Sequence, residues 1–397
     1  MIKRDYEEYR RAFEGVPKPF AYLDLDLLSE NIRSIAGKCG DKTLRLASKS
    51  LRSVRVIQFV LQASDRFRGV MCFTVPEAVY LAEQGLDDLL VGYPAWEPEH
   101  LRQAARKIAD GRRITLMADS AEHIDHLEVI ARETGVRIPV CLDIDMSVSY
   151  PGLHFGVRRS PLRTAEEALA LVRRIASSPH LLLDGLMGYE AQIAGVGDRY
   201  PGAWAKNLLV RMLKRHSVRV VAERRGALVQ AVRDLGIPLR FVNGGGTGSL
   251  ATTARDPSVT EVTVGSGLYA PALFDYYRDF RYQPAAGFAI EIVRRPHPGI
   301  YTCAGGGYVA SGAAGRDKLP VPYLPEGARL LPLEGAGEVQ TPLRYEGPIA
   351  LNLGDPVFLR HAKAGELCER FDRLHLFSEG RIVGEASTYR GDGRCFL

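Results

Sequence analysis

Short apolar runs alternate with amphipathic segments over most of the chain. Runs typical of strands, such as 20–25, 89–93 and 138–144, each precede a segment with helical periodicity. The two kinds of segment alternate about nine times, which is typical of a parallel sheet covered by helices. We therefore predict an α/β fold, and so many repeats favour a closed, TIM-like (β/α)8 barrel. An open doubly wound sheet is the alternative, although no G-x-G-x-x-G motif follows the first predicted strand.

The pattern changes towards the end of the chain. From about residue 289 the apolar runs are short and are separated by glycine and proline, as in 301–304, 356–359 and 374–378. This pattern predicts a domain of antiparallel β-strands. The predicted organisation is an N-terminal arm at 1–19, a barrel at 20–281 and a C-terminal β-domain at 282–397.

Composition limits the classes of partner. The 397 residues are 46% hydrophobic and 25% charged, as in soluble globular proteins, and the net charge is only +5. The arginines are scattered, so we expect no nucleic-acid partner. The first residues are too charged for a signal peptide and no apolar run reaches membrane-spanning length, so we expect no membrane partner. Six cysteines without paired spacing predict reduced thiols and a cytoplasmic location.

One lysine lies where a predicted strand ends. In the stretch LRLASKSLR, Leu44, Leu46 and Ala47 form the apolar run and Lys49 follows it. Burial of a lysine lowers its pKa, and a neutral amine can attack a carbonyl to form a Schiff base. The alternative is an ordinary loop lysine that precedes the helix predicted at 51–62.

Other polar and glycine-rich segments also follow predicted strands, where the reactive groups of a barrel lie. His154 and Arg158 follow the sixth strand, Tyr189 follows the seventh, and glycine-rich loops at 243–249 and 265–269 follow the last two. Glycine lets backbone N–H groups approach a phosphate, and hydroxyl groups can add hydrogen bonds. The predicted phosphate contacts are Gly245, Gly246, Thr247, Gly248, Gly265 and Ser266. A reactive lysine and a phosphate cradle in one barrel predict pyridoxal 5′-phosphate.

With these residues, the chain resembles the fold-type III pyridoxal-phosphate enzymes. These enzymes combine an alanine racemase-like barrel with a β-domain, and the similarity is greatest to the D-threonine aldolase and D-serine dehydratase branch. The resemblance rests on Asp24-Leu25-Asp26, on Arg45 four residues before Lys49, on Gly188-Tyr189, on the two glycine loops and on the stretches 334–342 and 360–371. It implies that Lys49 forms the Schiff base with the cofactor, that Arg45 and Tyr189 contact the cofactor, and that the protein is a homodimer.

The sequence departs from the family pattern at two places. Where the family often has an arginine beside the phenolic oxygen of the cofactor, this chain has His154, with Arg158 nearby. The alternative for His154 is a packed loop residue. The family also binds a divalent ion through a histidine and an aspartate or cysteine two residues later, but here Lys363 follows His361 at that spacing. His361 with Cys368, or with Glu366 as a harder ligand, is then the candidate zinc or manganese site, and a metal-free site with the charge of Lys363 is the alternative.

The resemblance predicts a lyase that acts on a small amino acid with a β-hydroxyl group. The leading hypothesis is cleavage of the Cα–Cβ bond to glycine and an aldehyde, with Lys49 and His361 as catalytic residues and His361 as the base. A dehydratase that yields a keto acid and ammonia, and a racemase, use the same residues. A non-catalytic carrier of pyridoxal phosphate and a cofactor-free aldolase that uses Lys49 directly are the alternatives from other classes.

Overall fold

The computed structural model describes residues 2–396, which form two compact units. Of the described residues, the barrel unit comprises Ile35–Lys49, Ile57–Gly265 and Phe396. The sheet unit comprises residues 2–34, Ser50–Val56 and Ser266–Cys395. The change from one unit to the other at Gly265 differs from the predicted domain boundary at residue 281.

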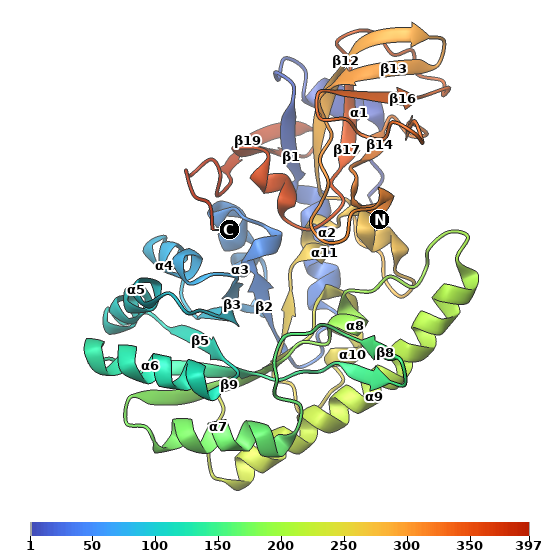
Figure 1. The fold of residues 1–397 in the computed structure, drawn as a ribbon. Helices are drawn as coiled ribbons and strands as arrows, with labels where there is room; N and C mark the ends of the chain where they lie inside the picture. The colour runs from blue at the N-terminus through green and yellow to red at the C-terminus, as the bar shows by residue number, and fades with distance from the viewer. Residues whose placement is uncertain (1, 397) are drawn as a thin grey trace. The chain divides into compact units, whose positions relative to one another are not determined.

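The barrel unit contains eight parallel strands that close on themselves in the order β10-β11-β2-β3-β4-β5-β6-β9. Figure 1 labels β2, β3, β5 and β9 among them. The strands are β2 (Thr43–Ala47), β3 (Phe67–Cys72), β4 (Leu89–Pro94), β5 (Ile114–Ala118), β6 (Ile138–Asp143), β9 (Leu181–Gly188), β10 (Phe241–Gly244) and β11 (Glu261–Val264). Their side chains are mostly buried because the interior and the covering helices enclose both faces. The predicted α/β barrel is confirmed.

Helices connect the strands, and four of them (α4, α5, α6 and α7) begin after a residue whose side chain caps them. They are α3 (Val54–Ala63), α4 (Val75–Glu83), α5 (Pro98–Ala109), α6 (Ala121–Thr134), α7 (Ala165–Ser177), α8 (Ala191–Ala194), α9 (Trp204–Asp234) and α10 (Leu250–Thr253). Thr164 and Glu167 form a capping box at the start of α7, and Gly135 ends α6 with a positive φ of 67°. Within residues 2–396, every helix is too short or too polar to cross a lipid bilayer.

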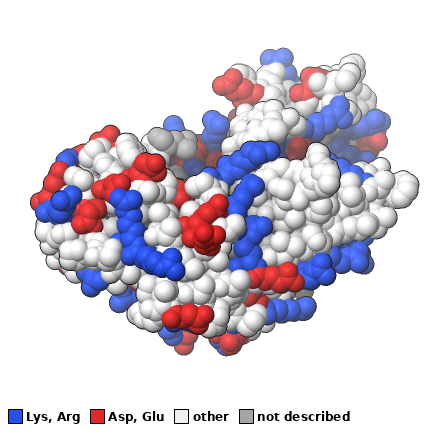
Figure 2. Space-filling view, turned by 60° about the horizontal axis from the view of Figure 1, so that its bottom comes forward, with Lys and Arg blue, Asp and Glu red and all other residues white. Residues whose placement is uncertain are grey.

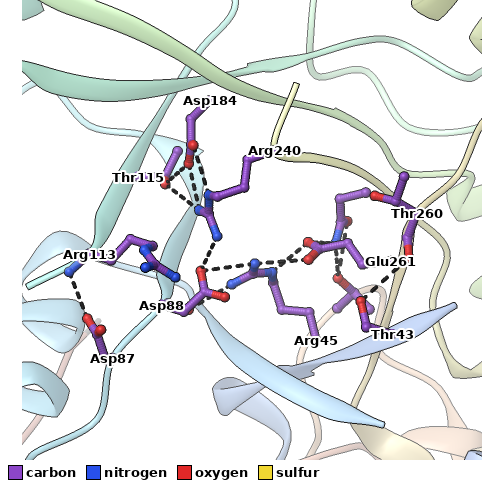
Figure 3. A network of polar contacts seen from close by, with 12 residues as sticks. Thr43, Arg45, Asp87, Asp88, Arg113, Thr115, Asp184, Arg240, Thr260 and Glu261 are labelled. Atoms are coloured by element: carbon purple, nitrogen blue, oxygen red, sulfur yellow. Dashed lines mark hydrogen bonds and ion pairs between the residues drawn. The ribbon is translucent and has the colours of Figure 1, made fainter. Parts of the chain in front are cut away.

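The amino-terminal end of the barrel is filled by a polar network (Figure 3). Arg45 is 1% exposed and donates to both carboxylate oxygens of Glu261, at 2.6 and 2.9 Å, and to the Asp88 carbonyl at 2.7 Å. Arg240 connects Asp88 to Asp184, at 2.7 and 2.6 Å. These contacts tie together β2, β9, β11 and the residues that precede β4 and β10, and they pair charges that would be costly to bury alone.

The sheet unit contains nine strands. Seven of them lie in the order β15-β16-β13-β12-β1-β18-β19, while β17 pairs with β12 and β14 pairs with β17. They are β1 (Phe20–Asp24), β12 (Ala286–His297), β13 (Ile300–Ala304), β14 (Val321–Leu324), β15 (Arg329–Leu330), β16 (Gln340–Arg344), β17 (Pro356–Arg360), β18 (Arg373–Ser378) and β19 (Arg381–Ser387). All pairs are antiparallel except β1 with β18, so the predicted antiparallel domain is confirmed.

The strand β1 is in the sheet unit, although the sequence pattern predicted it as the first barrel strand. It pairs with β12 and β18. All five of its residues are buried, as in the barrel strand β5, so its apolar pattern is the same as that of a barrel strand. Periodicity identifies a doubly buried strand but does not identify its sheet. The predicted arm belongs to the same unit, because Tyr9 of α1 (Tyr6–Ala12) donates to Asp24 at 2.8 Å.

Candidate active site

Lys49 lies at the carboxyl-terminal end of the barrel, as predicted. It is in the short 3₁₀ helix η1 (Ser48–Ser50) that follows β2 directly. The side chain is exposed, so the expected burial of this lysine is wrong. The Lys49 Nζ donates a hydrogen bond to the phenolic oxygen of Tyr93, at 2.7 Å. Tyr93 is near the end of β4, so the pair joins the ends of two barrel strands.

An arginine lies between two tyrosines at the same end of the barrel. The guanidinium carbon of Arg159 is 5.4 Å from the centre of the Tyr93 ring and 5.5 Å from that of the Tyr189 ring. Burial raises the pKa of Tyr93, but the charge and the hydrogen bond of Lys49, together with Arg159, outweigh this effect and lower it. Burial raises the pKa of Tyr189 to about 12, with Arg159 opposing. Tyr93 therefore loses its phenolic proton at a lower pH than Tyr189 does.

A buried carboxylate ends β6 at this end of the barrel. Burial, together with the charge of Asp119, raises the pKa of Asp143 to about 7, and Arg159 partly opposes this rise. Asp119 itself pairs with His123, whose Nδ1 is 2.9 Å from the carboxylate. Asp143 can therefore gain or lose a proton near neutral pH, as a general acid or base must.

The first glycine loop follows β10 and is held by a buried glutamate. Glu190 accepts hydrogen bonds from the Gly245 N–H at 3.0 Å, from the Ser249 hydroxyl at 3.3 Å and from the Thr253 hydroxyl. Arg225 neutralises it at 3.0 Å. Gly245 has a φ of +78°, and a Cβ there would lie 2.6 Å from a methyl group of Val262. The loop therefore requires glycine for both its conformation and its packing.

The rest of the predicted phosphate cradle lies at the ends of β10 and β11. The Gly246 N–H donates to the Ser249 hydroxyl at 3.1 Å, and Thr247 and Gly248 lie in the 3₁₀ helix η2 (Thr247–Ser249). The Gly265 N–H donates to the Thr247 hydroxyl at 3.2 Å. Ser266 begins α11 (Ser266–Tyr269) of the sheet unit, and its hydroxyl is 3.3 Å from that of Ser50.

The arrangement of the barrel residues fits pyridoxal phosphate. The strands β10, β11 and β2 are neighbours in the barrel, so the two glycine loops and Lys49 follow the same end of three adjacent strands. A Cβ on Gly246 would lie 3.0 Å from Ala194 and 3.3 Å from the ring of Tyr189, so the loop has little room for a side chain at this position. An amine for the aldehyde and close backbone approach for the phosphate are the two features that this cofactor needs.

Arg45 does not belong to this site. Its guanidinium contacts Glu261 and Asp88 at the amino-terminal end of the barrel (Figure 3). Lys49 follows the carboxyl-terminal end of β2. The predicted contact between Arg45 and the cofactor is therefore wrong. Spacing in sequence suggested proximity to Lys49, but Arg45 lies within β2 and Lys49 lies after its end, so the two side chains are at different heights along the barrel.

His154 and Arg158 have different surroundings from those predicted. His154 is in β8 (Leu153–Phe155), which pairs with β7 (Val148–Tyr150). Its Nε2 is buried and has no hydrogen-bond partner among the described residues, so its role at the cofactor stays a prediction. Arg158 is exposed, and it is the neighbouring Arg159 that contacts the tyrosines.

The second predicted catalytic residue, His361, follows β17 in the sheet unit. The imidazole is fully buried, and neither ring nitrogen has a side-chain partner among the described residues. Burial, with the charge of Arg360, lowers the pKa of His361 to about 3. This burial makes the imidazole a weak base in the structure, and the predicted role of His361 as the general base stays a prediction.

The residues predicted to bind a metal make other contacts in this structure. Cys368 donates from its Sγ to the Leu51 carbonyl at 3.2 Å, and burial raises the pKa of its thiol to about 12. Lys363 donates to the hydroxyl and the carbonyl of Ser311, at 2.7 and 3.0 Å. Across residues 2–396, no three His, Cys, Asp or Glu side chains are grouped as metal ligands.

Tyr93, Asp143, Arg159 and Glu190 were not predicted from the sequence. Tyr93 and Asp143 lie at the ends of β4 and β6, so the rule that selected Lys49 and Tyr189 applies to them equally. Arg159 adjoins the predicted Arg158. Glu190 follows Tyr189 directly, but nothing in the sequence indicates that its carboxylate turns towards the glycine loop.

Comparisons with known proteins agree with this geometry. Residues 23–272 match the model of the family described as "Alanine racemase, N-terminal domain". The chain is 27% identical over 266 residues to the 3-hydroxy-D-aspartate aldolase of Paracoccus denitrificans, which covers 66% of this chain and 62% of that enzyme. The match thus spans less than two thirds of the length of that relative.

Two solved structures have the same fold. The D-threonine aldolase of Filomicrobium marinum gives a TM-score of 0.81 at 21% identity and covers 96% of both chains. The D-threo-3-hydroxyaspartate dehydratase of Delftia sp. gives a TM-score of 0.70 at 20% identity and covers 97% of this chain and 99% of the other. The similarity in fold therefore extends over both units of the chain.

Proposed function

Because the chain belongs to the family of the alanine racemase N-terminal domain, we propose that it is a pyridoxal-phosphate-dependent lyase that cleaves a β-hydroxy-α-amino acid to glycine and an aldehyde. The observation that carries the proposal is the position of the Lys49 amine, next to the glycine loops at one end of the barrel. The names of the relatives support this activity, since two are aldolases of such amino acids.

Pyridoxal phosphate, when bound, withdraws electrons from the bonds at the α-carbon of an amino acid. Lys49 would hold its aldehyde end, and the loops at 244–248 and 265–266 would hold its phosphate. The Lys49 Nζ can carry a proton at this end of the barrel, and Tyr93 holds that amine in place at 2.7 Å. Arg159 supplies a positive charge beside both tyrosines, which can orient an anionic oxygen of a substrate.

A dehydratase is the second candidate, because the Delftia structure shares the fold over nearly the whole chain. Cleavage and dehydration give different products from the same substrate, so an assay distinguishes them. Purified protein with added pyridoxal phosphate is incubated with D-threonine, D-serine and 3-hydroxy-D-aspartate. We expect glycine and an aldehyde. A keto acid with ammonia would identify a dehydratase, an inverted amino acid would identify a racemase, and no turnover of any substrate would contradict the proposed function.

The quaternary structure and location are part of the proposal. We propose a homodimer, and an apolar face on α9 supports it, because Trp204 (77% exposed), Leu208, Leu209 and Met212 lie on one side of that helix without cover in the described chain. Sedimentation analysis should give twice the mass of the chain.

The six cysteines are free thiols, which supports the expected cytoplasmic location. On the face drawn in Figure 2, basic and acidic side chains are interspersed, in accord with the modest net charge.

A further inference from the structure

The hydroxyl of Tyr93 makes a direct contact with the reacting atom of Lys49. The two residues follow β2 and end β4, strands that both pair with β3, and Nζ and Oη are 2.7 Å apart. An amine and a phenol at this distance can exchange a proton without either side chain moving. The contact exists in the protein alone and does not depend on a bound ligand.

The groups around this pair favour charge on the phenol. Lys49 and Arg159 supply positive charges beside Tyr93, whereas Asp143 and burial of the ring oppose its ionisation. Tyr189 lies on the other side of Arg159. The balance of these effects lowers the pKa of Tyr93, while that of Tyr189 is raised. Of the two tyrosines beside Arg159, Tyr93 is therefore the one that ionises more readily, and only an ionised phenol can take a proton from Lys49.

We propose that Tyr93 is a catalytic residue that exchanges a proton with Lys49. The proton passes from Nζ to Oη when Lys49 has to present a free amine to an aldehyde, and it returns when Lys49 has to be protonated. An ammonium and a phenolate thereby become an amine and a phenol, and no other reactant is consumed. The inference rests on the proposed function only for the role of Lys49 as the residue that binds the cofactor aldehyde.

The first test measures the pair in the full-length protein without cofactor. Ultraviolet absorbance of phenolate is titrated with pH in the parent and in Tyr93→Phe, and the difference spectrum isolates Tyr93. We expect a midpoint below 10 that moves above 10 in Lys49→Met, since burial then acts without the charge of Lys49. A midpoint at or above 10 in the parent, or one that Lys49→Met does not move, would overturn the proposal. The control Tyr150→Phe removes a phenol that bonds to His216 at 2.8 Å, and its difference spectrum should not respond to Lys49→Met.

The second test follows the condensation of Lys49 with pyridoxal 5′-phosphate by absorbance, from pH 6 to 10. We expect the rate near pH 7 to fall about 100-fold in Tyr93→Phe and not in Tyr150→Phe, and the difference to shrink as pH rises, because hydroxide then removes the proton. Equal rates in the parent and Tyr93→Phe at all pH values would overturn the inference and leave the proposed function intact. Absence of condensation in the parent would instead contradict the proposed function, while the phenolate titration would still decide the inference.

Discussion

Arg45 and Glu261 form a bidentate ion pair at the amino-terminal end of the barrel, with N–O distances of 2.6 and 2.9 Å. The side chains are 1% and 7% exposed. Because each charge is neutralised where solvent does not reach, the pair fixes the register of β2 against β11, the two strands after which Lys49 and Gly265 lie. The site at one end of the barrel therefore depends on a network at the other.

Loss of the guanidinium should destabilise the fold. Arg45→Met leaves the carboxylate of Glu261 buried without its ionic partner, and we expect the free energy of unfolding to fall by about 3–5 kcal/mol. Arg344→Met is the matched control, since Arg344 and Glu346 form an ion pair that is about two thirds exposed, and its loss should cost less than about 1 kcal/mol. Urea unfolding measures both. Similar values for the two variants would refute the importance of the network.

The glycine at the start of the cradle should not tolerate a side chain. A Cβ at Gly245 would meet Val262 at 2.6 Å, and the φ of +78° is strained for alanine. We expect Gly245→Ala to lower the free energy of unfolding by about 1–3 kcal/mol and to weaken binding of pyridoxal phosphate. Gly226→Ala, in the middle of α9 with no atom within 4 Å of the new Cβ, should instead gain about 0.5–1 kcal/mol. Thermal unfolding measures the change in stability and cofactor titration measures the change in binding. A loss of stability in both variants would show that packing at the loop is not the cause of the loss in Gly245→Ala.

Asp143 should make stability depend on pH. Its pKa is raised by burial and by Asp119 from 3.8 to about 7, so the folded state binds a proton more tightly than the unfolded state does. The stability from this proton is fully present below about pH 4 and is lost as pH rises through about 7. Three pKa units correspond to about 4 kcal/mol.

The variant Asp143→Asn cannot ionise and should remove this dependence. We expect it to be more stable than the parent at pH 8 by about 1–4 kcal/mol, with the difference vanishing below pH 4. Urea unfolding at a series of pH values measures it. A difference that stays constant from pH 4 to 8 would mean that Asp143 titrates in the folded state as it does in water.

Metal removal should leave the protein unchanged. In this structure the thiol of Cys368 donates to the Leu51 carbonyl, and Lys363 donates to Ser311. We expect elemental analysis to find less than about 0.1 equivalents of zinc or manganese, and lyase activity to survive dialysis against a chelator. One equivalent of metal, or activity that a chelator abolishes and zinc or manganese restores, would contradict this expectation.

Patterns along the chain predicted the barrel because most barrel strands are apolar over most of their length and lead into a helix. They placed β1 in the wrong sheet, because a strand buried on both faces looks the same in either. In the site, the rule that chemistry follows strand ends found Lys49 and Tyr189. Local sequence does not determine the direction of a side chain, so Arg45 was assigned to the wrong end of the barrel. For the same reason the exposure of Lys49 and the burial that lowers the pKa of His361 were not predicted.

The central claim is that Lys49 binds the aldehyde of pyridoxal phosphate. Full-length protein saturated with the cofactor is reduced with borohydride and digested, and the modified peptide is identified by mass spectrometry. We predict one pyridoxyl group per chain, on Lys49, and no labelling above background in Lys49→Met. The control Lys206→Met, which replaces an exposed lysine of α9, should be labelled as fully as the parent. A label on another lysine, or undiminished labelling of Lys49→Met, would contradict the claim.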